Sequence, residues 1–173
     1  MFNKSLYISE MTKLIDEACQ RFVKEHADVV VFTVAIWTDP GAAASAISFD
    51  TATHSAEQIA LGDASAKKHY DRLMAAGDVE QAKLFAPSKP DARNCSPADF
   101  KYRDYGELDN KAFPFLWNEK AEGNYWDELE AAILQVGEMS LALLKQLRLH
   151  PKAELGMNGP RDWYEHTWDL GVS

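Results

Sequence analysis

The chain has 173 residues, 46% of them hydrophobic and 26% charged, and a formal net charge of −9 at pH 7. This length favours a single domain over residues 1–173 with its own hydrophobic core. The net charge argues against a nucleic-acid partner, whose phosphates need a basic surface. No apolar run approaches the roughly 18 residues of a membrane helix, so no membrane partner is expected either. Acidic side chains exceed basic ones most strongly in residues 97–130. Such a surface attracts basic partners, although acidity of this size is also ordinary in soluble proteins.

An amphipathic helix is predicted at the start of the chain, over residues 4–24. Its apolar side chains recur every three or four positions and form one stripe, made of Tyr7, Ile8, Met11, Leu14, Ile15, Ala18, Cys19 and Phe22. Residues 29–37 are almost all β-branched or aromatic, which favours a buried strand. The turn residues Thr-Asp-Pro-Gly follow at 38–41, and a second, alanine-rich strand is expected over 42–49. Together these segments predict a β-hairpin.

Two helices are predicted next, because Ser55 and Asp78 each begin a capping box with a glutamine three positions later. The first covers residues 56–76, and the glycine at position 62 is a candidate break within it. The second ends near residue 85. Prolines at positions 87, 90 and 97 then favour a loop.

The second half of the chain predicts a short strand near residues 100–105, a long helix over 125–149 and a final strand over 162–170. The long helix carries an apolar stripe, and Pro151 ends it. The last strand is inferred from alternation and from its aromatic residues. This order of elements predicts an α+β fold: one domain with a mostly antiparallel sheet, on which the N-terminal helix and the long C-terminal helix pack.

Sequence motifs for catalysis, phosphate binding and metal binding are absent, so no catalytic residue, cofactor or metal ligand is assigned. Glu165, His166 and Asp169 form the only cluster of acid and base groups. One alternative is therefore an enzyme whose acid/base site lies there, and the other is a surface histidine with ordinary hydrogen bonds. Cys19 and Cys95 lie far apart and outside any CxxC pattern, so two free thiols are expected.

The candidate protein-binding site is the segment dense in acidic and aromatic residues after position 98. It comprises Asp99, Tyr102, Asp104, Tyr105, Glu107 and Asp109. Aromatic anchors within a rim of one charge sign suit a protein–protein interface. The alternative is that these aromatics are core side chains with solvated acids between them. On a regular strand, Tyr102 and Asp104 would share one side and Tyr105 would lie on the other.

Three short motifs carry a resemblance to a known family. Residues 36–39 read Ile-Trp-Thr-Asp, residues 50–53 read Asp-Thr-Ala-Thr, and residues 96–102 read Ser-Pro-Ala-Asp-Phe-Lys-Tyr. With the N-terminal helix, this layout resembles a bacterial family of small cytoplasmic proteins that is known only as a domain of unknown function. Proteins of this kind often look like immunity proteins, which are small, acidic, and bind and block a cognate toxin.

The resemblance implies a non-catalytic, immunity-type protein that neutralises a bacterial toxin, and the acidic composition suits a basic toxin domain as its protein partner. The start of the chain lacks the apolar block of a secretory signal, so a cytoplasmic location is expected. A structural or regulatory subunit of a larger assembly is a further alternative. The oligomeric state and the identity of the partner do not follow from the sequence.

Overall fold

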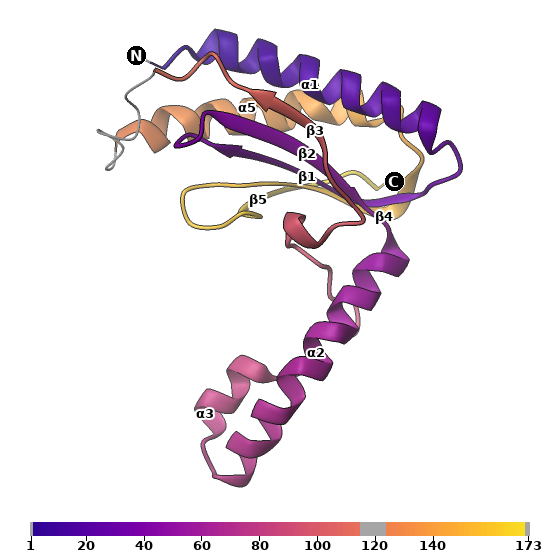
Figure 1. The fold of residues 1–173 in the computed structure, drawn as a ribbon, viewed down its shortest axis with the longest axis vertical. Coiled ribbons are helices and arrows are strands. Elements are labelled where there is room, and N and C mark those ends of the chain that lie inside the picture. The colour runs from indigo at the N-terminus through magenta and orange to yellow at the C-terminus, as the bar shows by residue number, and fades with distance from the viewer. Residues whose placement is uncertain (1, 115–123, 172–173) are drawn as a thin grey trace. The chain divides into compact units, whose positions relative to one another are not determined.

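The computed structural model describes residues 2–114 and 124–171, which form an α+β fold (Figure 1), as the sequence predicts. Contacts divide the chain into two compact units, residues 1–51 with 95–173, and residues 52–94. The elements of the first unit are α1 (Lys4–Glu25), β1 (Val31–Asp39), β2 (Ala44–Asp50), the 3₁₀ turn η2 (Pro97–Asp99), β3 (Tyr102–Asp109), α5 (Asn124–Leu144), β4 (Leu149–Met157) and β5 (His166–Asp169). The second unit contains α2 (Ala52–Ala75), α3 (Val79–Ala82) and the 3₁₀ turn η1 (Lys83–Phe85).

The first unit is built on one five-stranded sheet with the order β3-β2-β1-β4-β5. Three of its four strand pairs are antiparallel, and β1 with β4 is the parallel pair. The mostly antiparallel sheet is therefore confirmed. The predicted hairpin is also confirmed, with Ile36 opposite Ile47. Asp39 stabilises its turn, because Asp39 Oδ1 accepts hydrogen bonds from the backbone N–H groups of Gly41 and Ala42.

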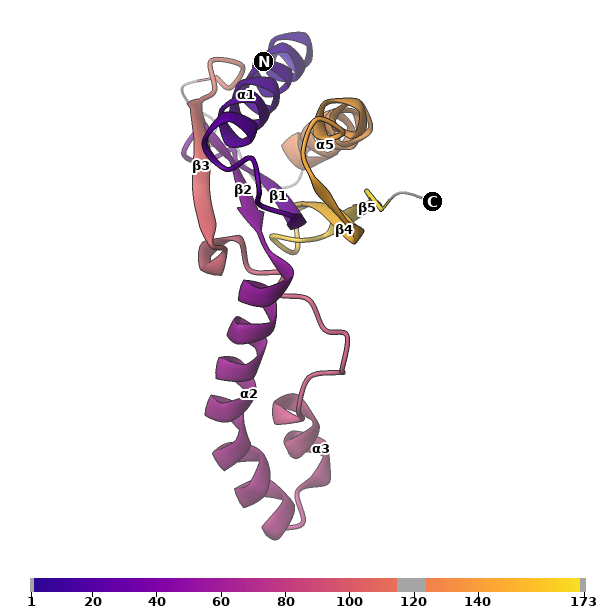
Figure 2. The same cartoon turned by 90° about the vertical axis from the view of Figure 1, so that its right-hand side faces the viewer.

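Both helices of the first unit, α1 and α5, lie on the same side of the sheet and pack against each other (Figures 1 and 2). Strand positions alternate between the two faces of the sheet. The helix-covered face carries large buried side chains, namely Val34, Ile36, Ile47, Phe49, Leu155 and Met157. The helix-free face carries small ones at the same depth, including Ala35, Ala46, Ser48 and Gly156. All but one of the predicted stripe residues of α1 are buried; the exception, Ile8, is half-buried.

The end of α5 differs from the prediction. The helix stops at Leu144 rather than near residue 149, and residues 149–157 form β4, which the sequence analysis did not predict. Leu149 already pairs with Val31 of β1. Pro151 also disfavours a helical conformation for His150, the residue before it. Tertiary pairing with β1 thus overrides the helical propensity of this segment.

The last strand is shorter than predicted. Strand β5 covers only His166–Asp169, and residues 162–165 belong to the connection from β4. Asp162 bends this connection, because its Oδ1 accepts a hydrogen bond from the backbone N–H of Tyr164. The aromatic pattern that predicted a strand therefore mixes strand residues with residues of a loop.

The second unit, residues 52–94, is a helical pair with little buried surface. Helix α2 starts at Ala52, earlier than predicted, and continues through Gly62 without a break. The predicted cap of the next helix is confirmed, since Asp78 Oδ1 accepts from the backbone N–H of Gln81. Ser55 is the buried residue of α2 and Ala82 that of α3. Within the described ranges, no helix is long and apolar enough to cross a membrane. That residues 1–173 form a single domain stays a prediction.

Candidate functional site

Strand β3, at one edge of the sheet, contains five of the six residues predicted to bind a protein. Its pairing with β2 shifts register between Ile47 and Phe49, and Asp104 has a positive φ of 46°. This irregularity turns both Tyr102 and Tyr105 toward the helices, instead of placing them on opposite sides as a regular strand would. The predicted sidedness was therefore wrong.

The two tyrosines are packed against α1 rather than presented to solvent as anchors. The rings of Tyr102 and Tyr105 lie edge-on to Phe22, at centroid distances of 5.0 and 5.2 Å. The Tyr105 hydroxyl donates to Glu25 at 2.6 Å, and the Arg21 guanidinium lies 4.3 Å from its ring centroid. Partial burial, followed by the hydrogen bond to Glu25, raises the pKa of Tyr105. For these two residues the alternative interpretation, core aromatics between solvated acids, fits the structure.

Three of the predicted acids lie near a pair of tryptophans on the helix-free face, of which Trp163 is exposed and Trp37 is half-buried. The strand register places Trp37, Ala46 and Glu107 in one cross-strand row, and Asp39, Ala44 and Asp109 in the next row. Asp104 accepts a hydrogen bond from Trp37 Nε1 at 3.2 Å, and Trp163 meets the Trp37 ring edge-on at 6.1 Å. We call these residues with Asp162 the acidic-tryptophan surface: Trp37, Asp39, Asp104, Glu107, Asp109, Asp162 and Trp163. Asp99 is exposed in η2 and lies outside this set.

The loop between β4 and β5 covers part of the helix-free face. Gly156 of β4 faces this side, and a Cβ at this position would overlap the ring of Tyr164. The Tyr164 hydroxyl donates to Glu154 on the same strand at 2.9 Å. The sheet therefore needs a glycine here, because an aromatic side chain of the loop lies directly on its backbone.

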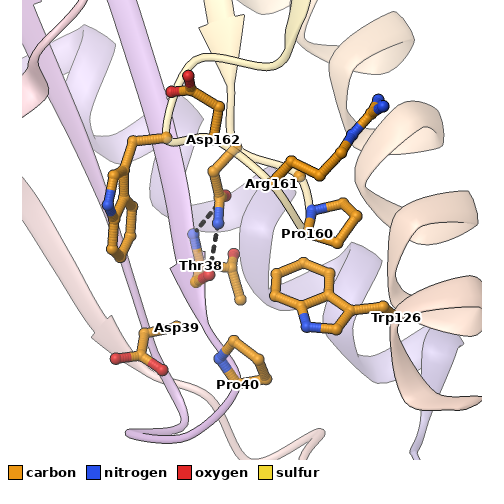
Figure 3. Close-up of a pocket in the computed structure, with 10 residues that line it drawn as sticks. Thr38, Asp39, Pro40, Trp126, Pro160, Arg161 and Asp162 are labelled. Carbon is orange, nitrogen blue, oxygen red and sulfur yellow. Dashed lines mark hydrogen bonds between the residues drawn. The ribbon is translucent and has the colours of Figure 1, made fainter. Parts of the chain in front are cut away.

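A pocket of about 330 Å³ lies where this loop meets the end of β1 (Figure 3). Asn158 joins the two segments: its side-chain amide donates to the Thr38 carbonyl at 2.8 Å and accepts from the Thr38 N–H at 2.9 Å. The side chain thus extends the β1–β4 pairing by one more pair of hydrogen bonds. Trp126 reaches from α5 toward Pro40 and Pro160, and Trp163 completes the aromatic lining.

A buried chain of hydroxyl groups begins at Thr38, one of the residues that line the pocket. Tyr7 and Thr38 hydroxyls lie 2.8 Å apart, and Thr38 and Ser45 hydroxyls 2.7 Å apart. Ser45 donates to Asn110 Oδ1, so the Thr38 hydroxyl donates to Ser45 and accepts from Tyr7. Burial raises the pKa of Tyr7. Each of these hydroxyls therefore has a hydrogen-bond partner. Together the hydrogen bonds fix the end of β1 against α1.

The predicted acid/base cluster is rearranged in the structure. His166 lies on the helix-covered face of β5, whereas Asp169 lies opposite Glu154 on the helix-free face. Glu130 of α5 takes the place of Asp169, because its Oε1 lies 3.1 Å from His166 Nε2. Ligand atoms of Glu130, Glu165 and His166 all lie within 4.8 Å of one another.

Arg161 holds the carboxylate of Glu165. Its backbone N–H donates to Glu165 Oε2 at 2.9 Å, its Nε donates to Oε1 at 2.7 Å, and its Nη2 also bonds Oε1. These bonds, the backbone one first and then those of the side chain, lower the pKa of Glu165. Glu165 is therefore an anion at neutral pH and is fixed in orientation.

Sequence reasoning assigned none of Trp37, Trp163 and Glu130 to a site, and for Trp163 it favoured core packing over an interface. Trp163 and Tyr164 were predicted to lie in the last strand. They lie in the loop before it, because β5 begins only at His166. Glu130 was one of several acids near the start of the long helix, where the helix dipole already accounts for them. Only the packing of α5 beside β5 brings it to His166.

The two cysteines do not pair with each other among the described residues. Cys19 is a buried residue of α1, and Cys95 is exposed. Comparisons with protein-family models, with curated proteins and with solved structures gave no match to this chain.

Proposed function

We propose that this chain is a non-catalytic protein-binding module whose acidic-tryptophan surface binds a basic protein. In this proposal the partner is a bacterial toxin domain, as the resemblance to immunity-type proteins implies. The observation that carries the proposal is Trp163, which is 55% exposed although it packs against Trp37. A large aromatic side chain held in place at the surface is typical of an interface anchor.

The charges around the tryptophans support a basic partner. Glu107 and Asp109 are exposed, and among the described residues neither of them forms an ion pair. Asp104 accepts a hydrogen bond from the Trp37 indole, and its Oδ2 lies 3.5 Å from Arg103 Nε. Exposed carboxylates of one sign accelerate the approach of a basic partner, and an aromatic anchor then slows its departure.

The proposal keeps three of the predicted binding residues and changes the role of three others. Asp104, Glu107 and Asp109 belong to the surface. Tyr102 and Tyr105 support the surface without contacting the partner. Their packing on α1 fixes the irregular part of β3 that contains Asp104. Asp99 has no assigned role in binding.

The test is affinity capture from the native host, followed by binding kinetics with the captured partner at low and high salt. Two variants address the surface: a charge reversal, Glu107→Lys with Asp109→Lys, and Trp163→Ala. A matched control, Glu57→Lys with Glu128→Lys, changes the net charge by the same amount at exposed positions outside the surface.

We expect the charge reversal to slow association by about tenfold at low salt and less at high salt. Trp163→Ala is expected to accelerate dissociation by about tenfold or more, and the control to bind like the unmodified protein. Suppression of the partner's toxicity on co-expression would support the toxin assignment. Equal binding by all variants would refute the surface, and a captured partner that is not toxic would refute the toxin assignment alone.

A further inference from the structure

We propose that Glu130, Glu165 and His166 form a binding site for a divalent transition-metal ion. The site would join α5 to β5 and to the end of the loop before it, on the helix-covered side of the sheet. Its donor atoms lie within 4.8 Å of one another. The proposal does not depend on the proposed function.

The donor set suits zinc or manganese. Two carboxylate oxygens and one imidazole nitrogen are ligands that these ions accept, at bond lengths of about 2.0–2.2 Å. Ligands around such an ion lie roughly 3–3.5 Å apart, so small side-chain movements suffice to close the present spacing. Three protein ligands leave a coordination position for water or another small ligand.

His166 provides the observation that points to a ligand. Its Nε2 is buried from solvent and makes no hydrogen bond of good geometry to any described residue, although Glu130 Oε1 lies 3.1 Å away. A buried polar atom without a directed hydrogen bond is unfavourable, because it has lost its bonds to water without gaining others. A cation between the imidazole and the Glu130 carboxylate would satisfy both groups at once.

Arg161 has the position of a residue that orients a ligand. Its guanidinium bonds Oε1 of Glu165, and its backbone N–H donates to Oε2. These bonds fix the Glu165 carboxylate in orientation beside the other two donor groups. Metal-binding carboxylates are usually held in this way by a second hydrogen-bonded residue.

Gly159 closes the site from the side of the loop. A Cβ at this position would overlap Glu165 Oε2 and would lie 3.0 Å from His166 Nε2. The backbone thus approaches both donor groups more closely than any other residue type would allow. This approach also shields the donors from water, which explains why the Glu165 side chain is only 8% exposed.

The experiment is isothermal titration of the full chain, stripped of metal with a chelator, with zinc chloride and separately with manganese chloride. The expected result is one equivalent of bound ion and a higher melting temperature in its presence. Glu130→Gln and His166→Gln should each weaken binding by at least about 100-fold, and Arg161→Ala by about tenfold, as for a residue that orients a ligand. Glu128→Gln on the same helix and His69→Gln in the second unit serve as matched controls.

Circular dichroism of each variant without metal shows whether it is folded, and cobalt absorption spectra test the ligands directly. A cobalt complex without a thiolate charge-transfer band excludes the exposed Cys95 as a ligand. The proposal is overturned if the chain binds neither ion. It is equally overturned if folded Glu130→Gln and His166→Gln variants bind as tightly as the controls.

Discussion

The two faces of the central sheet differ in what their side chains do. On the helix-covered face, large apolar residues such as Phe49 and Leu155 are fully buried. On the other face, neighbouring positions of the same strands carry alanine, serine and glycine, and tryptophans and carboxylates gather at one end of the strands. Because strand residues alternate, one hairpin supplies both the core and the candidate binding surface. Stability and binding are thus expected to respond to different substitutions in adjacent positions.

The largest effect is expected from truncation on the helix-covered face. Phe49→Ala removes a ring whose centroid lies 4.5 Å from that of Phe22 and 5.5 Å from that of Tyr105. We expect the free energy of unfolding to fall by about 3–5 kcal/mol, as for other buried phenylalanines. Urea denaturation followed by circular dichroism measures this loss. A loss below about 1 kcal/mol would mean that this face is not the core of the unit.

A smaller loss is expected on the helix-free face when a side chain is added rather than removed. Gly156→Ala forces the ring of Tyr164 off the sheet, because the new Cβ would overlap it. Overpacking of this kind costs about 1–3 kcal/mol. The matched substitution Gly62→Ala meets no atom within 4 Å on α2 and should stabilise the protein by up to about 1 kcal/mol. Equal effects of the two alanines in denaturation experiments would refute the role of Tyr164.

The sequence predicted those elements whose pattern is local. The stripe of α1, the hairpin and the cap at Asp78 were confirmed, because spacing, turn chemistry and capping act within a few residues. Strand β4 was missed, because its parallel pairing with β1 joins residues far apart in the chain. The faces of Tyr102 and Tyr105 were wrong for a related reason: the irregularity at Asp104 depends on pairing with β2. In the same way, Glu130 meets His166 only after α5 packs.

Ionisation of the buried Cys19 thiol should affect stability only in alkaline solution. Burial, and then the charge of Asp16, raise the pKa of Cys19 from 9.0 to about 12. In the unfolded chain the thiol ionises near pH 9, while in the folded protein it stays protonated, so stability is full below pH 9 and falls between about 9 and 12. The slope is at most about 1.4 kcal/mol per pH unit. Between pH 8 and pH 10, the free energy of unfolding should decrease less for Cys19→Ala than for the unmodified protein. An equal decrease in both proteins would contradict the raised pKa of Cys19.

The smallest effect on stability is expected at the most exposed aromatic residue of the surface. Trp163→Ala should change the free energy of unfolding by about 0.5 kcal/mol or less, because more than half of the side chain already contacts water. Trp168→Ala is the matched control on the other face, where the indole packs on Gly137 and donates to Glu138 at 2.8 Å. It should destabilise the protein by several times more. If the two tryptophans cost the same in urea denaturation, Trp163 is a structural residue, and the acidic-tryptophan surface loses the anchor on which its assignment rests.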